Sequence, residues 1–214
     1  MEIEYKTVLK EAVAEFEEKK SKFIASVKPV SKEEEALEFI NRIKSRYWDA
    51  THNVYAYYIG GDVTTQRFSD DGEPSGTAGM PVLEVIKRMD VRDLVVVVTR
   101  YFGGTLLGAT GLVRAYSKSA TLGIEAAGIV KKSLCTEVKA IVEYTLWGKV
   151  QNLIQKKGYP VNNISYGQDI DISIFVPVGE ADDFLILMEE ETNGRAVTEL
   201  GEKMYVPMNE TFFK

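Results

Sequence analysis

Residues 94–111 read LVVVVTRYFGGTLLGATG, and this stretch decides how the first half of the chain folds. It begins with Leu94 to Val98, a fully apolar run of five residues. A short apolar run of branched residues that ends at polar and glycine residues is typical of a strand buried on both faces. The pattern therefore predicts such a strand over 94–99, then a glycine-rich turn, and then a helix from about Gly111 to Ala127.

The residues before this strand show alternating strand and helix patterns. Branched and aromatic content predicts strands over 8–16, 22–30 and 54–59. Ser31 and Glu34 form a capping box, which predicts that a helix starts there. One stripe of this helix is apolar and consists of Leu37, Ile40, Ile43 and Tyr47. Residues 60–77 are expected to be loop, and residues 80–89 a short helix with Pro81 in its first turn.

The second half of the chain reads as one β-α-β-β-α-β unit. The predicted strands are 136–145, 161–166, 169–178 and 196–206, and the predicted helices are 147–157 and 181–192. This order is the ferredoxin-like split βαβ arrangement. A helix pattern that stops at Gly128, followed by the basic residues Lys131 and Lys132, predicts a linker between two domains, 1–131 and 132–214. The fold class expected is therefore a two-domain α+β (α/β) protein.

Composition excludes several classes of site. The chain has 214 residues with a net charge of −6, and Cys135 and His52 are its only cysteine and histidine. A single cysteine cannot form an intramolecular disulfide or hold a four-cysteine iron–sulfur cluster. One cysteine and one histidine are also too few for a zinc site of the usual Cys/His kind. We expect no cofactor and no metal centre, although carboxylate-bound magnesium or calcium stays open. The first ten residues are charged and no apolar run approaches the roughly 20 residues of a membrane helix, so we expect a cytoplasmic protein.

The glycine-rich turn fails the two familiar phosphate-binding templates. Gly111 is followed by Leu112 instead of the Lys-Ser/Thr of a P-loop, and no G-x-G-x-x-G spacing is present. An ATPase and a nicotinamide dehydrogenase are therefore disfavoured. The glycines either let a backbone approach a ligand or only allow tight loop packing; they are Gly103, Gly104, Gly108 and Gly111.

A local excess of positive charge surrounds this turn. No Asp or Glu occurs from residue 94 to residue 124, whereas Arg100, Arg114 and Lys118 do. Arg114 and Lys118 are four residues apart and so share one helix face. If Arg100 lies beside them, these cations form a patch that binds phosphates, with nearby aromatic side chains available to stack on bases. The alternative is a solvated helix face with an arginine paired to Asp70 or Asp71.

A second segment, RFSDDGEPSGTAG at 67–79, gathers carboxylates beside glycines. Asp70, Asp71 and Glu73, together with His52, form either an acid/base cluster or a structural one that caps turns. Ser75 and Thr77 lie at the predicted start of a helix, where free backbone N–H groups favour an anion and where hydroxyls also serve as caps. No G-x-S-x-G elbow surrounds Ser75, and no residue is predicted to be catalytic.

Several ordered blocks of the first half resemble the YigZ/IMPACT family, and the tail resembles the second domain of its bacterial two-domain members. The blocks are DATHN at 49–53, DDGEPSGTAG at 70–79, TRYFGG at 99–104, LG at 107–108, GL at 111–112 and RAY at 114–116. The resemblance implies a first domain like the fourth domain of elongation factor G and a tail like that factor's fifth domain. It also implies a link to translation, because IMPACT itself is a translational regulator.

Three functional hypotheses follow. The leading one is a cytosolic, translation-linked regulator without enzymatic activity that binds RNA or the ribosome through the basic, glycine-rich patch. The second is an enzyme that acts on a small anionic, phosphorylated substrate at the loop 70–79. The third is a protein-interaction module that binds a partner through the sheet of the tail.

Overall fold

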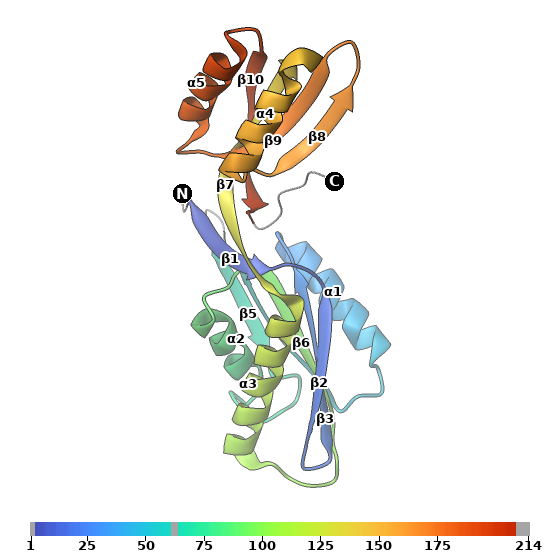
Figure 1. Ribbon diagram of the computed structural model, residues 1–214. Coiled ribbons are helices and arrows are strands. Elements are labelled where there is room, and N and C mark those ends of the chain that lie inside the picture. Colours follow the sequence, from blue (N-terminus) through green and yellow to red (C-terminus); the bar gives the residue numbers. More distant parts are fainter. Residues whose placement is uncertain (1–2, 61–63, 209–214) are drawn as a thin grey trace. The chain divides into compact units, whose positions relative to one another are not determined.

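The computed structural model describes residues 3–60 and 64–208, and it divides them into two compact units (Figure 1). Residues 6–130 form the first unit. The described residues of 1–5 and 131–214 form the second unit. Each unit contains an antiparallel sheet with its own helices, so the chain is a two-domain α+β protein, as predicted.

The first unit contains a sheet in the order β2-β3-β6-β4-β5, with every neighbouring pair antiparallel. Its strands are β2 (Ala12–Glu18), β3 (Ser21–Pro29), β4 (His52–Ile59), β5 (Thr65–Ser69) and β6 (Leu94–Tyr101). The central strand β6 covers the apolar run that the sequence singled out, and its residues 94–100 are all buried. The prediction of a strand buried on both faces is confirmed.

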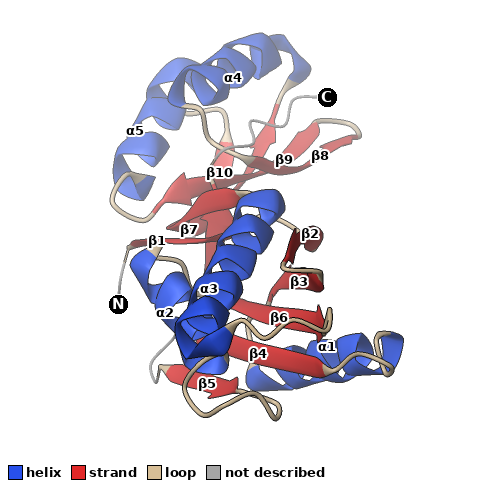
Figure 2. Cartoon of the chain, turned by 90° about the horizontal axis from the view of Figure 1, so that it is seen from below, coloured by secondary structure: helices blue, strands red, loops and turns tan. Residues whose placement is uncertain are grey.

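Helices cover both faces of this sheet (Figure 2). They are α1 (Glu33–Arg46), α2 (Gly79–Arg88) and α3 (Gly108–Ala127). Alternate residues of β6 point to opposite faces. Val96 and Val98 therefore share a core with α2 and α3, while Val95 and Val97 share another core with α1.

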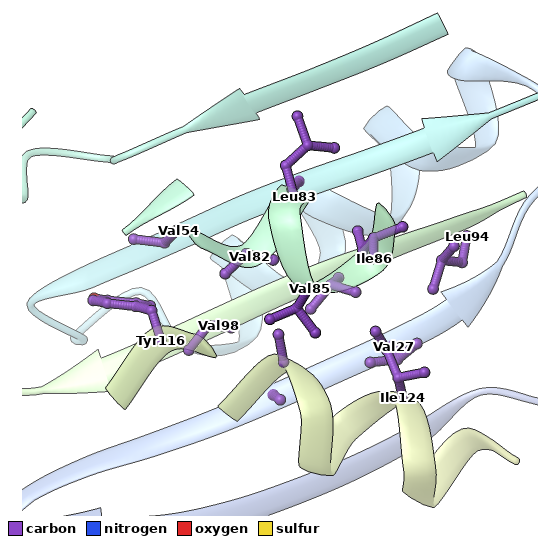
Figure 3. Close-up of a cluster of buried hydrophobic side chains, with 14 of the residues drawn as sticks. Val27, Val54, Val82, Leu83, Val85, Ile86, Leu94, Val98, Tyr116 and Ile124 are labelled. Atoms are coloured by element: carbon purple, nitrogen blue, oxygen red, sulfur yellow. The ribbon is translucent and has the colours of Figure 1, made fainter. Parts of the chain in front are cut away.

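The core under α2 and α3 is tightly packed (Figure 3). Val54 and Val98 from the sheet meet Val82 of α2 and Tyr116 of α3. Gly123 allows α3 to lie close to β3, because an added Cβ there would stand 2.8 Å from the Cβ of Ala25. This close packing fixes the position of α3, whose first turns carry two of the predicted cationic residues.

The second unit has the predicted β-α-β-β-α-β order. Its elements are β7 (Ile129–Val142), α4 (Tyr144–Lys157), β8 (Val161–Tyr166), β9 (Ile170–Pro177), α5 (Ala181–Thr192) and β10 (Val197–Pro207). The strand order is β1-β7-β9-β8, with β10 also paired to β7; β1 spans Glu4–Val8. Helices α4 and α5 pack on one face, over a core that includes Phe184 and Ile174. Gly158 ends α4 in the left-handed conformation, with φ +67°.

Four local predictions differ from the structure. The predicted loop 60–77 contains the strand β5, and its residues 61–63 lie outside the described residues. The predicted linker after Gly128 is instead the start of the long strand β7. The predicted first strand, 8–16, is divided between β1 and β2. In α1, Leu37 is exposed, because the buried stripe consists of Ala36, Phe39, Ile40 and Ile43.

The predicted capping box of α1 is also not observed, because the N-cap residue is Lys32 and it makes no side-chain cap hydrogen bond. The backbone N–H of Ser31 donates to the carboxylate of Glu35, at 2.7 Å, where the sequence pattern pointed to Glu34. Within residues 3–60 and 64–208, no helix is long and apolar enough to cross a membrane. The likeness of the two domains to the fourth and fifth domains of elongation factor G stays a prediction.

Candidate functional site

Four loops gather at one end of the first unit, and they carry most of the residues predicted for function. Antiparallel pairing places Tyr101 beside Lys22 and Arg100 beside His52, so strand β6 ends where β3 and β4 begin. The loops at this end are 19–20, 47–51, 70–78 and 102–107, and we call them the loop end. The β2–β3 turn and the first turn of α3 lie at the lower end of this unit in Figure 1.

Specific hydrogen bonds tie these loops together. The backbone N–H of Thr51 donates to the carbonyl of Arg100 at 2.9 Å, and the Thr51 hydroxyl oxygen accepts the N–H of Phe102 at 3.0 Å. The Tyr101 hydroxyl donates to Asp49 at 2.8 Å. Gly103 lies against the β2–β3 turn, where an added Cβ would collide with the carbonyl group of Lys20. The loop after β6 is therefore fixed to its neighbours by backbone contacts.

Asp70 caps helix α2 from outside the helix. Its Oδ1 accepts the N–H groups of Ala78 and Gly79, at 3.1 and 2.8 Å, and its Oδ2 accepts that of Gly76 at 2.9 Å. The Thr77 hydroxyl donates to the Pro74 carbonyl. The amino end of α2, predicted to bind an anion beside Ser75 and Thr77, is thus already bonded to a carboxylate of the chain.

Asp71 is a second structural carboxylate. It has φ +46°, and its Oδ2 accepts the backbone N–H of Asn53 at 2.7 Å while its Oδ1 bonds Lys44 at 2.8 Å. Its carbonyl lies 2.8 Å from Nδ1 of His52. Because a carbonyl can only accept, this contact places the proton of the neutral imidazole on Nδ1.

Glu73 is the buried centre of this end of the molecule. Its Oε1 accepts hydrogen bonds from Arg100 Nη1 at 2.6 Å and from the Tyr116 hydroxyl at 2.7 Å. Its Oε2 lies 3.9 Å from Nε2 of His52. Burial, together with the bond to the Glu73 carboxylate, raises the pKa of Tyr116 well above its ordinary value, so the phenol stays protonated.

His52, Asp71 and Glu73 therefore come together, while Asp70 acts at the start of α2. Every one of these carboxylates accepts hydrogen bonds from the protein, which is the arrangement of a structural cluster. Among residues 3–60 and 64–208, no group of three or more His, Cys, Asp or Glu side chains is placed to hold a metal ion. The observed bonds favour the structural interpretation of the cluster over acid/base chemistry.

The structure separates Arg100 from the other two predicted cations. Arg100 is 5% exposed, and its guanidinium bonds Glu73 and Ser21 inside the protein. Arg114 and Lys118 are exposed on α3. The alternative predicted an arginine paired to Asp70 or Asp71. An arginine of this region, Arg100, is paired to a carboxylate of the loop 70–79, but the carboxylate is Glu73.

Arg114 and Lys118 line a pocket of about 380 Å³ together with Lys19, which the sequence argument did not select. The other lining residues are Phe16, Glu18, Leu107, Thr110, Gly111 and Ala115. The ammonium of Lys118 lies 4.5 Å from the centre of the Phe16 ring. The pocket is next to the first turn of α3, which contains no acidic residue. We call this pocket, whose cations are Lys19, Arg114 and Lys118, the cationic pocket.

The four predicted glycines have different roles. Gly103 is required by the close approach to Lys20, and Gly111 lines the cationic pocket. Gly104 and Gly108 have φ +83° and +72°, and the space beside each is open. Only the left-handed backbone therefore favours glycine at these two positions.

Comparisons with family models cover both units. Residues 19–124 match the Impact N-terminal domain, and residues 141–195 match a domain of unknown function, DUF1949. The IMPACT family member YvyE of Bacillus subtilis is 42% identical over 202 residues, which are 94% of this chain and 93% of that protein.

Two solved structures also match parts or most of the chain. A crystal structure of a hypothetical protein matches 94% of this chain and 99% of its own, with 27% identity and a TM-score of 0.61. The two-domain translational regulator Yih1 matches 56% of this chain and 46% of its own, with 28% identity and a TM-score of 0.36.

Proposed function

The chain belongs to the IMPACT family, as a YigZ-type two-domain member, and on this premise we propose that it is a cytosolic, translation-linked regulator that binds RNA or the ribosome through its first unit. The binding residues in this proposal are Arg114, Lys118 and Lys19. The predicted contribution of Arg100 becomes indirect, because its charge is buried against Glu73.

The observation that carries the proposal is the cationic pocket. Lys19, Arg114 and Lys118 line one pocket with a single carboxylate, Glu18, on a chain whose net charge is −6. The positive end of the α3 dipole adds to the local field. Such a site favours phosphate groups over neutral ligands, and most contacts that position a protein on nucleic acid are made to phosphates. The overall negative charge limits non-specific binding and favours a local, shaped contact.

A second candidate function is protein binding through the second unit. Helices α4 and α5 cover one face of its sheet, and a groove of about 410 Å³ is lined by residues of its strands, including Ile141, Val197 and Asn162. Nothing comparable favours the enzyme hypothesis, because the carboxylates of the loop 70–79 are bonded to the protein around them.

Ribosome co-sedimentation over a range of salt concentrations tests the leading proposal. The variant Lys19→Ala/Arg114→Ala/Lys118→Ala should co-sediment more weakly than the unchanged chain. If the three cations contact phosphates, the slope of log affinity against log salt should fall by about 2, since each lost contact to single-stranded nucleic acid removes roughly 0.7.

The matched control is Lys149→Ala/Lys156→Ala/Lys157→Ala, which removes the same charge from exposed positions of α4. This control should keep the affinity and slope of the unchanged chain. Equal binding by both triple variants would remove the cationic pocket from the proposal.

A further inference from the structure

Large apolar side chains are exposed at the loop end. Trp48 and Leu106 are each 82% exposed, and Phe102 is 45% exposed. Tryptophan is highly buried on average, so an almost fully exposed tryptophan in the same loop cluster as an exposed phenylalanine is a feature that contact with a ligand would explain. Trp48 and Phe102 belong to segments joined by hydrogen bonds, because Asp49 bonds Tyr101 and Thr51 bonds Phe102.

The Phe102 ring is held in place by the buried cluster. The guanidinium of Arg100 lies over it, 5.5 Å from the ring centre, and lies equally far from the Phe23 ring. Arg100 is itself fixed by Glu73 at 2.6 Å, and the backbone of Phe102 is fixed by Thr51 at 3.0 Å. Arg100 therefore packs against one side of the ring, and the exposed remainder is available to a flat ligand. A ring fixed in advance loses little conformational entropy when a ligand stacks on it.

Phe102 is close along the chain to the cationic pocket, and the Trp48 segment is joined to Phe102 by the hydrogen bonds above. Phe102 is five positions before Leu107, which lines the cationic pocket. A fully extended chain rises about 3.3–3.6 Å per residue, so their backbones are at most about 18 Å apart. A nucleic-acid strand of a few nucleotides can therefore contact Phe102 and the cations at once, with a base on the ring and phosphates on the cations.

We propose that the loop end binds single-stranded RNA, with bases stacked on Trp48 and Phe102 and the backbone held by Lys19, Arg114 and Lys118. This inference rests on the proposed function and narrows its ligand. Single strands are favoured over duplexes because stacking needs unpaired bases, and paired RNA hides the faces of its bases. Arg100 is in this view a positioning residue that acts through Phe102.

The test compares two probes that share a backbone and differ in bases. One is an oligouridylate of about 12 nucleotides, within the site sizes known for single-strand binders. The other is an abasic ribose–phosphate chain of the same length. Binding is followed by fluorescence anisotropy with the full chain. Stacking is worth about 1–3 kcal/mol per base, so the full chain should prefer the oligouridylate by about fivefold or more.

The variants separate stacking from general apolar contact. Trp48→Leu/Phe102→Leu keeps apolar side chains but removes both rings, and it should bind the oligouridylate as weakly as the abasic chain. Trp48→Phe/Phe102→Tyr keeps two rings and should restore the preference. Leu106→Ala is the matched control, since it changes an equally exposed apolar residue without a ring, and its affinity should equal that of the unchanged chain.

Fluorescence gives a second measurement. The chain has two tryptophans, so Trp147→Phe leaves Trp48 as the only one. In this background, the oligouridylate should quench the fluorescence of Trp48 and the abasic chain should not.

The outcomes distinguish failure of base stacking, failure of the cationic pocket and failure of the single-strand inference. If the leucine variant keeps the preference for bases, or if Leu106→Ala reduces binding as much, stacking is wrong and the rings form an apolar protein-docking surface. If the leucine variant loses the preference while the cationic variant binds both probes normally, stacking holds and the cationic pocket fails. If the chain co-sediments with ribosomes but binds neither probe, the proposed function stands and the single-strand inference is overturned.

Discussion

At the scale of single residues, the ion pair between Arg100 and Glu73 organises the loop end. Both groups are almost fully buried, at 5% and 7% exposure, and Tyr116 donates to the same carboxylate oxygen. A buried pair gains little net stability over an apolar replacement, because desolvation offsets most of the attraction. Removing one partner is costly, since the other charge then stays buried without compensation.

We therefore predict that Glu73→Gln lowers the free energy of unfolding by about 3–5 kcal/mol. Glutamine keeps the size of the side chain and an acceptor for Tyr116 but leaves the Arg100 charge unpaired. Urea unfolding measures the change, with Glu84→Gln at an exposed position of the same unit as the control, where a change within about 0.5 kcal/mol is expected. Adding Arg100→Met to Glu73→Gln should recover most of the loss; a further loss would contradict this account.

The sequence alone predicted two of the three cations of the pocket, but it did not predict which side chains surround each predicted cation. The absence of acidic residues from 94 to 124 indicated a basic patch, but the partner of Arg100 lies 27 positions away at Glu73. Only the three-dimensional fold brings them together. Lys19 was missed for the same reason, since it comes from a hairpin turn far from α3 in the sequence. A pair of lysines at that turn was the one available signal.

At the scale of elements, helix α2 depends on a cap that lies nine residues before its first residue. Asp70 supplies both carboxylate oxygens to three backbone N–H groups, and α2 has no side-chain cap of its own at Ala78. Loss of a helix cap usually costs about 1 kcal/mol, with a range up to about 2.

We predict that Asp70→Ala lowers the free energy of unfolding by about 2 kcal/mol, near the top of that range, because three N–H groups lose their acceptor. Asp70→Asn keeps one acceptor oxygen and should lose clearly less. Chemical denaturation of both variants gives the comparison, and circular dichroism of the folded proteins confirms that the fold is kept. Equal losses for the two variants would indicate that the negative charge matters more than the bonds.

The elements predicted correctly from the sequence are those with strong apolar patterns. Strand β6 and helix α3 follow directly from such patterns, as does the β-α-β-β-α-β order of the tail. Strand β5 was missed because it is short, polar and at the sheet edge, so its residues show no alternation. The start of β7 was interpreted as a linker because Lys131 and Lys132 are adjacent and polar, although Val130 before them is buried.

At the scale of the whole molecule, each unit has its own hydrophobic core. The cores on the two faces of the β6 sheet belong to the first unit, and a separate core lies under α4 and α5 in the second. Compact units with separate cores are able to open separately. Family membership extends over both units, so the two-domain architecture is shared with the relatives that match along their full length.

We predict that Phe184→Ala destabilises the second unit selectively. Phe184 is fully buried and packs edge-on against Tyr159, with ring centres 5.2 Å apart, and loss of such a ring costs about 3–5 kcal/mol. Amide hydrogen exchange followed by mass spectrometry should show faster exchange in β9, with β6 unchanged. Equally faster exchange in both strands would show that the chain unfolds as one cooperative unit.

The glycine at position 103 has a consequence for how this protein can change over evolutionary time. Any side chain at this position meets the backbone of the β2–β3 turn at Lys20, and a backbone cannot rotate away as a flexible side chain can. Selection is therefore expected to remove any substitution of Gly103 unless a second change shifts the hairpin. Substitutions in the turn that contains Lys19 and in the loop that contains Phe102 are thus expected to be correlated among homologous chains.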